Sequence, residues 1–288
     1  MPLALELPSG DLPLVSVIIP TRNRVDLLRT CLKGIDATDY PQIEVIVVDN
    51  DSDDPETLGF LADLDPTRHR ILRHEGTFNY SAINNRAVME ARGKLLCLLN
   101  NDIEVVEQGW LKAMVSQALR DEVGAVGARL LYPDGRIQHA GVVIGMGNAA
   151  GHAHRFIRPN EEGYFYRHAL PQFASAVTAA CLVVRRDRFL AVGGLDERNF
   201  AVAFNDVDLC LRLNQQGWQT LYEPRATLTH HESVSRGLDR DPVGAARFAG
   251  ELAALQRLWG THELVDPFHH PELSRASERF VLRLRAGP

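Results

Sequence analysis

Three short apolar runs in the first hundred residues constrain the fold of this chain most strongly. LVSVIIP (14–20), IEVIVVD (43–49) and LLCLL (95–99) are each bounded by polar residues. Runs of this length predict strands that are covered on both faces. The segment 26–35 between the first two has helical spacing, since its apolar residues fall on one face. Alternating buried strands and helices predict a parallel, doubly wound α/β sheet.

Further elements extend this pattern to residue 110. A helix is expected after the acidic, proline-containing entry at 51–64, a third strand around 70–75, and a helix over 81–93 that is closed by a glycine. The strand 95–99 then ends in Asn100-Asn101-Asp102. We therefore expect a Rossmann-like, mostly parallel central sheet, with this cluster at the strand ends where open α/β sheets bind ligands.

The pattern changes after residue 110. One more helix and a strand lead to residues 135–175, which are rich in Gly, His, Arg and aromatic residues and predict a loop-rich region over a site. Strand and helix return at 175–197, a helix follows at 205–217, and short strands are expected before residue 232. The helical tail has apolar residues spaced for one buried face, namely Phe248, Leu252, Leu255 and Leu258.

These changes suggest a division of the chain. Residues 1–13 form a lead-in and residues 14–240 one α/β domain. That domain has a nucleotide-binding half, 14–110, and an acceptor and catalytic half, 111–240. Residues 241–288 form a helical extension.

Composition excludes several classes of protein. The formal net charge of −6 argues against a broad nucleic-acid surface, and no apolar stretch approaches the ~18 residues of a transmembrane helix. The N-terminus lacks the pattern of a signal peptide. Four widely spaced cysteines in apolar surroundings predict reduced core residues in a cytoplasmic protein. No GxGxxG, GxxxxGK[ST] or GxSxG motif is present, which argues against dehydrogenases, P-loop NTPases and the common hydrolases.

What remains is a set of polar residues at strand and helix ends. Asp49-Asn50 ends the second strand, Asp206 and Asp208 open a late helix, and His230-His231 follows a short strand. Taken singly, these residues could be a turn, a favourable helix start or surface histidines. Together with Asp102, carboxylate and imidazole suit Mn²⁺ or Mg²⁺ carrying a phosphate.

Six segments in register closely resemble family 2 glycosyltransferases with the GT-A fold. The resemblance covers roughly residues 14–240, and the nearest branch is the bacterial, rhamnosyltransferase-like enzymes that build surface polysaccharides. The segments are VSVIIPTRNR, VIVVDNDS, NYSAINNRAVMEARGKLLCLLNNDIEV, AACLVVRRDRFLAVGGLDE, FNDVDLCLRLNQQGW and HHESVSRG.

The resemblance implies roles for individual residues. Asp102 would be the metal ligand, with His230 reaching the metal or the diphosphate. Asn84-Asn85 stands where the family usually has Arg-Asn, so Arg22 or Arg86 would take the diphosphate role, and Arg236 could clamp a phosphate. The residues implied to bind the nucleotide are Pro20, Thr21, Arg22, Asp49, Asn50, Asn84, Asn85, Asn100 and Asn101.

Catalysis is implied at the second acidic pair. Asp206 matches the family's catalytic base, with Asn205 replacing a glutamate, and Asp208 would orient the base or the acceptor. Transfer from a UDP- or dTDP-linked sugar needs a divalent ion on the leaving diphosphate and a base for the acceptor hydroxyl. A single base opposite the leaving group predicts inversion at the anomeric carbon, by the logic of inverting hydrolases.

Two alternatives stay open at this stage. A sugar-nucleotidyltransferase would share the sheet but usually carries a glycine-rich phosphate loop. A noncatalytic nucleotide- or carbohydrate-binding module is favoured by Asn100, Asn101 and Asn205 in place of acids. The expected partners are a nucleotide-sugar donor and a glycan or lipid-linked acceptor. A lipid-linked acceptor would bring this cytoplasmic protein to the inner face of the membrane or into an assembly complex.

Overall fold

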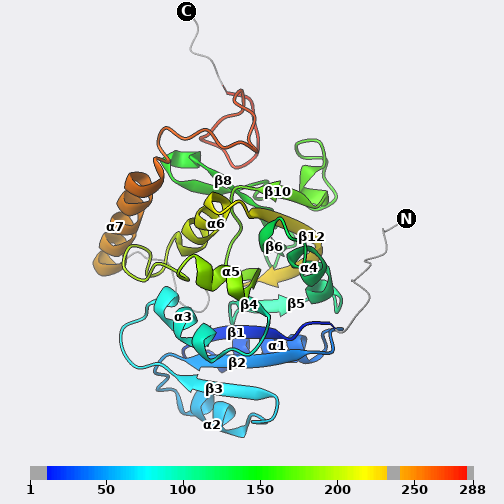
Figure 1. Cartoon of the computed structure of the whole chain (residues 1–288), viewed down its shortest axis with the longest axis vertical. Coiled ribbons are helices and arrows are strands. Elements are labelled where there is room, and N and C mark those ends of the chain that lie inside the picture. The colour runs from blue at the N-terminus through cyan, green and yellow to red at the C-terminus, as the bar shows by residue number, and fades with distance from the viewer. Residues whose placement is uncertain (1–11, 232–240, 284–288) are drawn as a thin grey trace, which may run out of the picture.

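The computed structural model describes residues 12–231 and 241–283 of the chain (Figure 1). The elements of the first half, in chain order, are β1 (Val15–Thr21), α1 (Val25–Asp36), β2 (Ile43–Asp49), α2 (Pro55–Asp63), β3 (His69–Arg73), α3 (Tyr80–Glu90), β4 (Leu95–Leu99), β5 (Ile103–Val105) and α4 (Trp110–Ala118). Those of the second half are β6 (Val123–Leu131), β7 (Ile137–His139), β8 (Val142–Ile144), β9 (Ala150–His152), β10 (Gln172–Ala174), β11 (Cys181–Arg185), α5 (Arg186–Ala191), α6 (Asn205–Gln215), β12 (Gln219–His230) and α7 (Pro242–Trp259).

One sheet organises the molecule. Its strand order is β10-β12-β6-β11-β4-β1-β2-β3, with β5 paired to β12 and β7 to β6. The strands β4, β1, β2 and β3 are parallel, as predicted for the first half. The second half is mixed, because β11 runs antiparallel to both β4 and β6. All five residues of β4 are buried, which confirms LLCLL as a central strand.

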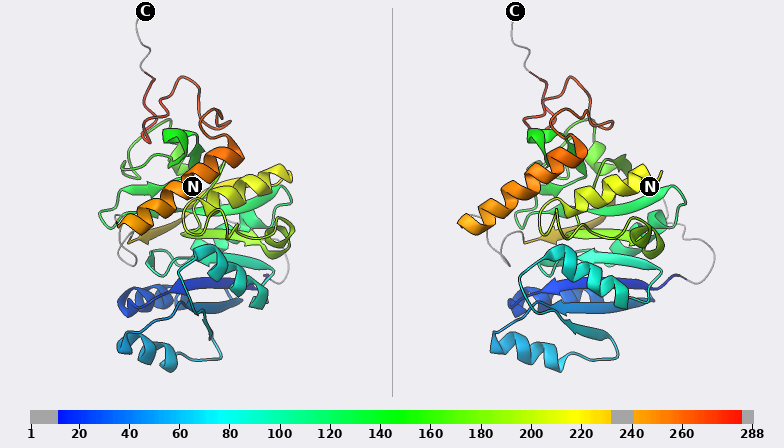
Figure 2. Two further views of the ribbon diagram at one scale, coloured as in Figure 1. Left: turned by 90° about the vertical axis from the view of Figure 1, so that its left-hand side faces the viewer. Right: turned by 60° about the vertical axis from the view of Figure 1, so that its left-hand side comes forward.

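Helices cover both faces of the sheet, as the doubly wound prediction requires (Figures 1 and 2). α1, α2 and α4 pack on one face, against β1 residues such as Val17. α3, α5, α6 and α7 pack on the other face, against Ile18 and its neighbours. Because successive strand residues point to opposite faces, a strand covered on both sides must be apolar throughout. All four cysteines are free and buried, as predicted.

Three local predictions needed correction. The segment before residue 232 is one twelve-residue strand, β12, and its register shifts between Glu223 and Thr227, where Pro224 cannot donate to the ladder. The helix expected over 81–93 ends at Glu90. Gly93 does not close the helix but allows close packing, because a Cβ at this position would lie 2.6 Å from the Ser16 backbone nitrogen.

The tail is helical, as predicted, but its buried face differs. Leu255 is fully buried and Leu252 partly so, whereas Phe248 and Leu258 are exposed. The deepest contacts of α7 instead include Glu251 and Ala254. α7 lies beside α6 in Figures 1 and 2. Within the described ranges, no helix has the length and apolar character needed to cross a membrane.

Candidate active site

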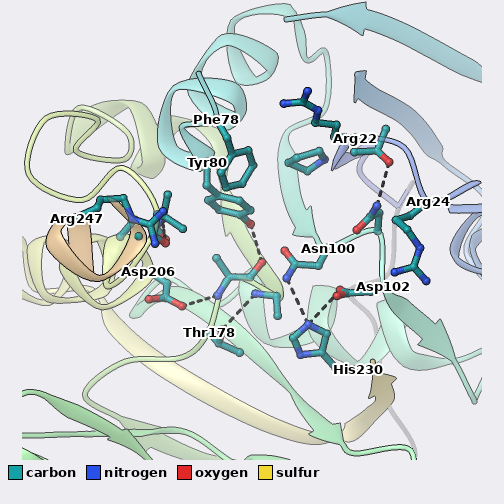
Figure 3. A pocket seen from close by; sticks show the side chains of 18 of the residues that line it. Arg22, Arg24, Phe78, Tyr80, Asn100, Asp102, Thr178, Asp206, His230 and Arg247 are labelled. Atoms are coloured by element: carbon teal, nitrogen blue, oxygen red, sulfur yellow. Dashed lines mark hydrogen bonds and ion pairs between the residues drawn. The ribbon is translucent and has the colours of Figure 1, made fainter. Parts of the chain in front are cut away.

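A cavity of about 800 Å³ opens at the carboxyl ends of β1 and β4. It lies where the parallel sheet was expected to bind ligands, and Figure 3 shows part of its lining. Walls come from both halves of the domain and from α7. The predicted site residues that line it are Pro20, Thr21, Arg22, Asn100, Asn101, Asp102, Asp206 and His230.

Asp102 and His230 form the polar centre of one wall. Asp102 Oδ1 lies 3.1 Å from His230 Nε2, although the two residues are far apart in sequence. The pairing of β5 with β12 brings them together, since Ile103 is the register partner of His230 and the His231 amide donates to the Asp102 carbonyl at 3.0 Å. Strand pairing therefore builds this site from two distant segments.

The hydrogen bonds around His230 fix which nitrogen faces the carboxylate. Its Nδ1 lies 2.7 Å from Gln138 Oε1, an oxygen that can only accept, so Nδ1 carries a proton. A neutral ring then presents the Nε2 lone pair toward Asp102 Oδ1, with Asn100 Nδ2 at 3.4 Å. Two acceptor atoms at 3.1 Å attract each other only through a cation or proton shared between them. The pair thus suits a divalent ion, with a second-shell partner holding the imidazole.

Two protein ligands are few for a metal site. Across residues 12–231 and 241–283, no group of three or more His, Cys, Asp or Glu side chains is arranged to hold a metal ion. Mg²⁺ sites that use one or two protein ligands normally rely on substrate phosphates and water for the rest. The residues present therefore fit an ion that arrives with a diphosphate.

Asp206 faces the cavity from the first turn of α6 (Figure 3). Its Oδ2 accepts a hydrogen bond from the Ala179 amide at 3.0 Å, and its Oδ1 accepts from the Val207 amide at 2.8 Å. Phe204, two residues before Asp206, has φ 61° and ψ 5°, a left-handed conformation that is uncommon for a bulky residue. This turn directs the chain into α6 and aims the carboxylate at the cavity.

The surroundings of Asp206 raise the pKa of its carboxyl above the ordinary aspartate value. Burial is the largest cause, because it disfavours the charged form. The hydrogen bonds from the Ala179 and Val207 amides and from the Thr178 side chain act in the opposite direction and limit the rise. A carboxylate with a raised pKa is a better proton acceptor than an ordinary surface aspartate.

Asp49 and Asn50 do not line the cavity. Asp49 accepts from the Ser52 amide at 3.1 Å and pairs with Arg73 at 2.9 Å. Asn50 donates to the carbonyls of His74 and Gly76 at 3.2 and 3.3 Å, while its Oδ1 is buried without a hydrogen-bond partner in the described ranges. Both lie at the carboxyl end of β2, as predicted, and their contact with a nucleotide stays a prediction.

Asn84 and Asn85 make hydrogen bonds within the chain, and their contact with a nucleotide stays a prediction. Asn84 is fully buried and donates to the Tyr80 carbonyl at 2.8 Å. Asn85 exchanges hydrogen bonds with the Leu195 backbone at 2.8 and 2.9 Å and donates to Glu197 at 2.8 Å. Neither side chain lines the cavity, so we assign Asn85 to holding the GGLDE turn in place.

Asp208 is also corrected, because it points away from the cavity into the contact between α6 and α7. Its carboxylate is 4% exposed, pairs with Arg212 at 2.7 Å, and accepts from Trp259 Nε1 at 2.9 Å. Residues two apart on a helix lie about 200° apart around its axis. Asp206 and Asp208 therefore face opposite directions, and Asp208 is a structural anchor.

Asp208→Ala is expected to destabilise the fold by about 3 kcal/mol. The change leaves the Arg212 charge and the Trp259 N–H without their partner in a largely buried contact, and breaking such a pair by removing one side is costly. Urea unfolding of the variant measures the loss. A change below about 1 kcal/mol would show that the carboxylate does not anchor α7.

Two further predicted residues fall elsewhere. Arg236 lies outside the described residues. His231, the less favoured of the two histidines, pairs with Glu104 at 2.9 Å on the outer side of the β5–β12 ladder. His154, in the loop-rich region, is buried and stacks on Phe280 with ring centroids 4.2 Å apart.

Several cavity residues were not found from the sequence. Tyr80 lines the cavity and donates to the Ala179 carbonyl at 3.0 Å. Tyr80 thereby fixes the residue whose amide donates to Asp206. The segment NYSAINN contained this tyrosine, but no spacing rule marked it. The other unforeseen lining residues used below are Arg24, Gln138 and Thr178, and His152 of the loop-rich region lines the cavity as well.

Comparison with known proteins agrees with this geometry. The model described as "Glycosyl transferase family 2" matches residues 16–187, more than half of the chain. The chain belongs to glycosyl transferase family 2. The matched range covers β1 from its second residue and all of β4, with the residues that follow them. It ends in α5, so Asp206 of α6 and His230 of β12 lie outside it.

Two bacterial relatives match almost the whole chain. The protein y4gI of Sinorhizobium fredii is 48% identical over 96% of this chain, and the O-antigen biosynthesis protein RfbC of Myxococcus xanthus is 43% identical over 96%. The chain spans 31% and 21% of the lengths of these relatives. This family 2 domain is therefore matched within proteins that are much longer than itself.

A solved structure supports the fold. Mannosyltransferase PcManGT from Pyrobaculum calidifontis, in complex with GDP-Man and Mn²⁺, aligns with a TM-score of 0.59 at 20% identity and covers 85% of this chain and 64% of its own. The predicted GT-A fold and glycosyltransferase class are confirmed, and family membership removes the sugar-nucleotidyltransferase alternative.

Proposed function

We propose that this family 2 domain transfers a sugar from a UDP- or dTDP-linked donor to a hydroxyl of a glycan or lipid-linked saccharide, with inversion. The observation that carries the proposal is that Asp206 and the Asp102–His230 pair line one cavity (Figure 3). The pair suits the diphosphate of the donor, and Asp206 suits the hydroxyl of the acceptor. A noncatalytic module would have no need of both.

Asp206 is the carboxylate best placed to act as the base. Among the described residues the cavity is lined by three carboxylates. Asp102 faces His230, and Asp241 caps α7 by accepting from the Val243 and Gly244 amides. Asp206 would take the proton of the acceptor hydroxyl as attack develops. One base with no second nucleophilic carboxylate favours a single in-line displacement and hence inversion.

Asp102 and His230 would hold the divalent ion, Mn²⁺ or Mg²⁺. Such an ion supplies Lewis-acid neutralisation of the leaving diphosphate. The chain's own part is to fix the two ligands, since Gln138 orients the imidazole and strand pairing sets the carboxylate. Arg22 and Arg24 also line the cavity (Figure 3). Arg24 pairs with Asp26 at 2.8 Å, so Arg22 is the guanidinium that we expect to face the diphosphate.

The biological setting follows from the relatives. The relative from Myxococcus xanthus is named for O-antigen biosynthesis, and that name supports a role for this chain in cell-surface polysaccharide synthesis. We place the reaction in the cytoplasm, at the inner face of the membrane if the acceptor is lipid-linked. The longer relatives suggest that the domain works beside other domains in such assembly.

Nucleotide-dependent stabilisation tests the proposal. UDP or dTDP with Mn²⁺, at 100 times its Kd, is expected to raise the free energy of unfolding by about 2.7 kcal/mol, and EDTA is expected to remove most of that gain. Thermal unfolding with UDP, dTDP, GDP and CDP measures the effect and identifies the base. No stabilisation by any nucleotide would contradict the proposed donor, and stabilisation without sugar transfer would favour a binding module.

A further inference from the structure

Two histidines of the loop-rich region form a contact that the transfer mechanism does not use. His139 Nδ1 lies 2.8 Å from His152 Nδ1, and the two rings are nearly perpendicular, at 87°. His139 is fully buried at the end of β7, and His152 lines the cavity at the end of β9. Two ring nitrogens at this distance must share one proton, donated by one ring and accepted by the other.

The surroundings of His139 decide which ring donates. Its Nε2 lies 3.3 Å from the Gly141 amide and 3.4 Å from the Thr178 amide, and both groups can only donate. Nε2 must therefore accept, so a neutral His139 carries its proton on Nδ1. That proton is donated to His152 Nδ1. His152 in turn carries its own proton on Nε2, the ring atom on the opposite side.

Both rings are held neutral. Burial lowers the pKa of His139 well below its ordinary value and the pKa of His152 to about 3. Burial is the largest of the causes at His152, and the nearby Arg155 guanidinium acts in the same direction. A single tautomer of each ring is then present near neutral pH, and it is the one set by the two backbone amides.

His152 lines the same cavity as Asp206, the proposed base. Thr178 donates to His139, and the next residue, Ala179, donates to Asp206 at 3.0 Å. Two consecutive amides thus connect the histidine pair to the base. His152 is fixed at its backbone as well, because its amide donates to Glu278 at 3.0 Å. In the described ranges its Nε2 makes no hydrogen bond within the chain and is not buried.

We infer that His152 is a specificity-determining residue whose Nε2–H, fixed by His139 and the Gly141 and Thr178 amides, donates a hydrogen bond to an oxygen of the acceptor saccharide. The inference rests on the proposed function for the identity of the ligand. A neutral N–H donor in a polar cavity selects a hydroxyl or carbonyl oxygen and gains nothing from an apolar group. A tautomer fixed in advance avoids the cost of ordering the donor on binding.

The tautomers are measured first, by long-range ¹H–¹⁵N correlation on protein labelled at histidine. The His152 ring, identified by its loss in His152→Gln, is expected as the Nε2–H form at pH 7, and His139 as the Nδ1–H form. In His139→Gln the new side-chain oxygen still accepts from the two amides but no proton faces His152, so His152 is expected to become a mixture of tautomers. A His152 ring found as Nδ1–H or as imidazolium overturns the inference, whether or not the protein transfers sugar.

Acceptor kinetics are measured next, with p-nitrophenyl glycosides as probes and the best of them for the wild type as acceptor. His152→Phe is expected to raise the acceptor KM about tenfold, the equivalent of one neutral hydrogen bond. His152→Gln, which keeps an N–H near the position of Nε2, is expected to recover most of that loss. A loss of UDP affinity as large as the loss of acceptor affinity, or no recovery in the glutamine variant, would overturn the assignment. A wild-type protein that glycosylates none of the probes contradicts the proposed function. The tautomer measurement then still decides whether His139 fixes the proton of His152 on Nε2.

Discussion

Asp206→Asn is expected to slow sugar transfer on the order of 10³-fold, since the base no longer accepts the proton of the acceptor hydroxyl. Nucleotide binding should survive, because Asp206 lies on the far side of the cavity from Asp102 and His230 (Figure 3). Initial rates with a saturating donor, together with the Kd for UDP, separate the two effects. A variant that retains more than about a tenth of the wild-type rate would remove Asp206 from the base role.

Asp187 provides a matched control. It occupies the first turn of α5 as Asp206 does in α6, and its Oδ1 accepts from the following amide, that of Arg188, at 2.9 Å. The corresponding distance at Asp206 is 2.8 Å. Asp187 does not line the cavity. Asp187→Asn therefore repeats the chemical change and the helix position without touching the site, and its transfer rate is expected to match the wild type.

Asp206→Asn also has a defined effect on the free energy of unfolding. The pKa of Asp206 is raised in the fold, so its contribution to stability is present below the unfolded pKa and is lost as pH rises through the folded pKa. Near neutral pH the ionised group therefore opposes folding. Asparagine removes that cost but accepts one fewer amide hydrogen bond. We expect the free energy of unfolding at pH 7 to stay within about 1 kcal/mol of wild type by urea titration.

The raised pKa also sets the acid limb of activity. Protonation of Asp206 removes the base, so the transfer rate is expected to fall as pH drops, with a midpoint above the ordinary aspartate pKa of about 3.9. The pH profile of kcat/KM for the acceptor measures this. A midpoint at or below 3.9 would contradict the effect of burial on this carboxylate.

Asp102→Ala is expected to abolish the Mn²⁺-dependent part of nucleotide stabilisation and to slow transfer on the order of 10²-fold or more. The alanine removes the carboxylate that faces His230 and, among the described residues, leaves the imidazole as the remaining protein ligand. Thermal unfolding with UDP or dTDP, with Mn²⁺ and then with EDTA, measures the first effect. If the metal-dependent shift persists in the variant, the metal assignment to Asp102 is wrong.

Glu104 and His231 form the control for this experiment. They make a second carboxylate–imidazole pair, at 2.9 Å, beside the same β5–β12 ladder. Successive residues of a strand point to opposite sides, so His231 faces away from His230, and neither Glu104 nor His231 lines the cavity. Glu104→Ala breaks a carboxylate–imidazole contact of the same kind on the outer side. Its nucleotide and metal response is expected to equal that of the wild type.

The sequence by itself determined the parallel first half of the sheet. The runs 14–20, 43–49 and 95–99 are buried parallel strands because a strand covered on both faces must be apolar at every position. The residues at the ends of β1 and β4 line one cavity, because the carboxyl ends of parallel strands lie at the same edge of the sheet. The two acids of α6, however, were both assigned to catalysis, and helix geometry sends Asp208 to the opposite side.

Tertiary structure alone decided the contacts between distant segments. The Asp102–His230 pair needs β5 to lie antiparallel to β12, and the His139–His152 contact needs two short strands of a region without periodicity to meet. Neither register is encoded in local spacing, because each is set by the packing of the whole second half around an antiparallel β11. The polarity of single strand ends could therefore be predicted from the chain, whereas the partner that each end faces is fixed only when the sheet is complete.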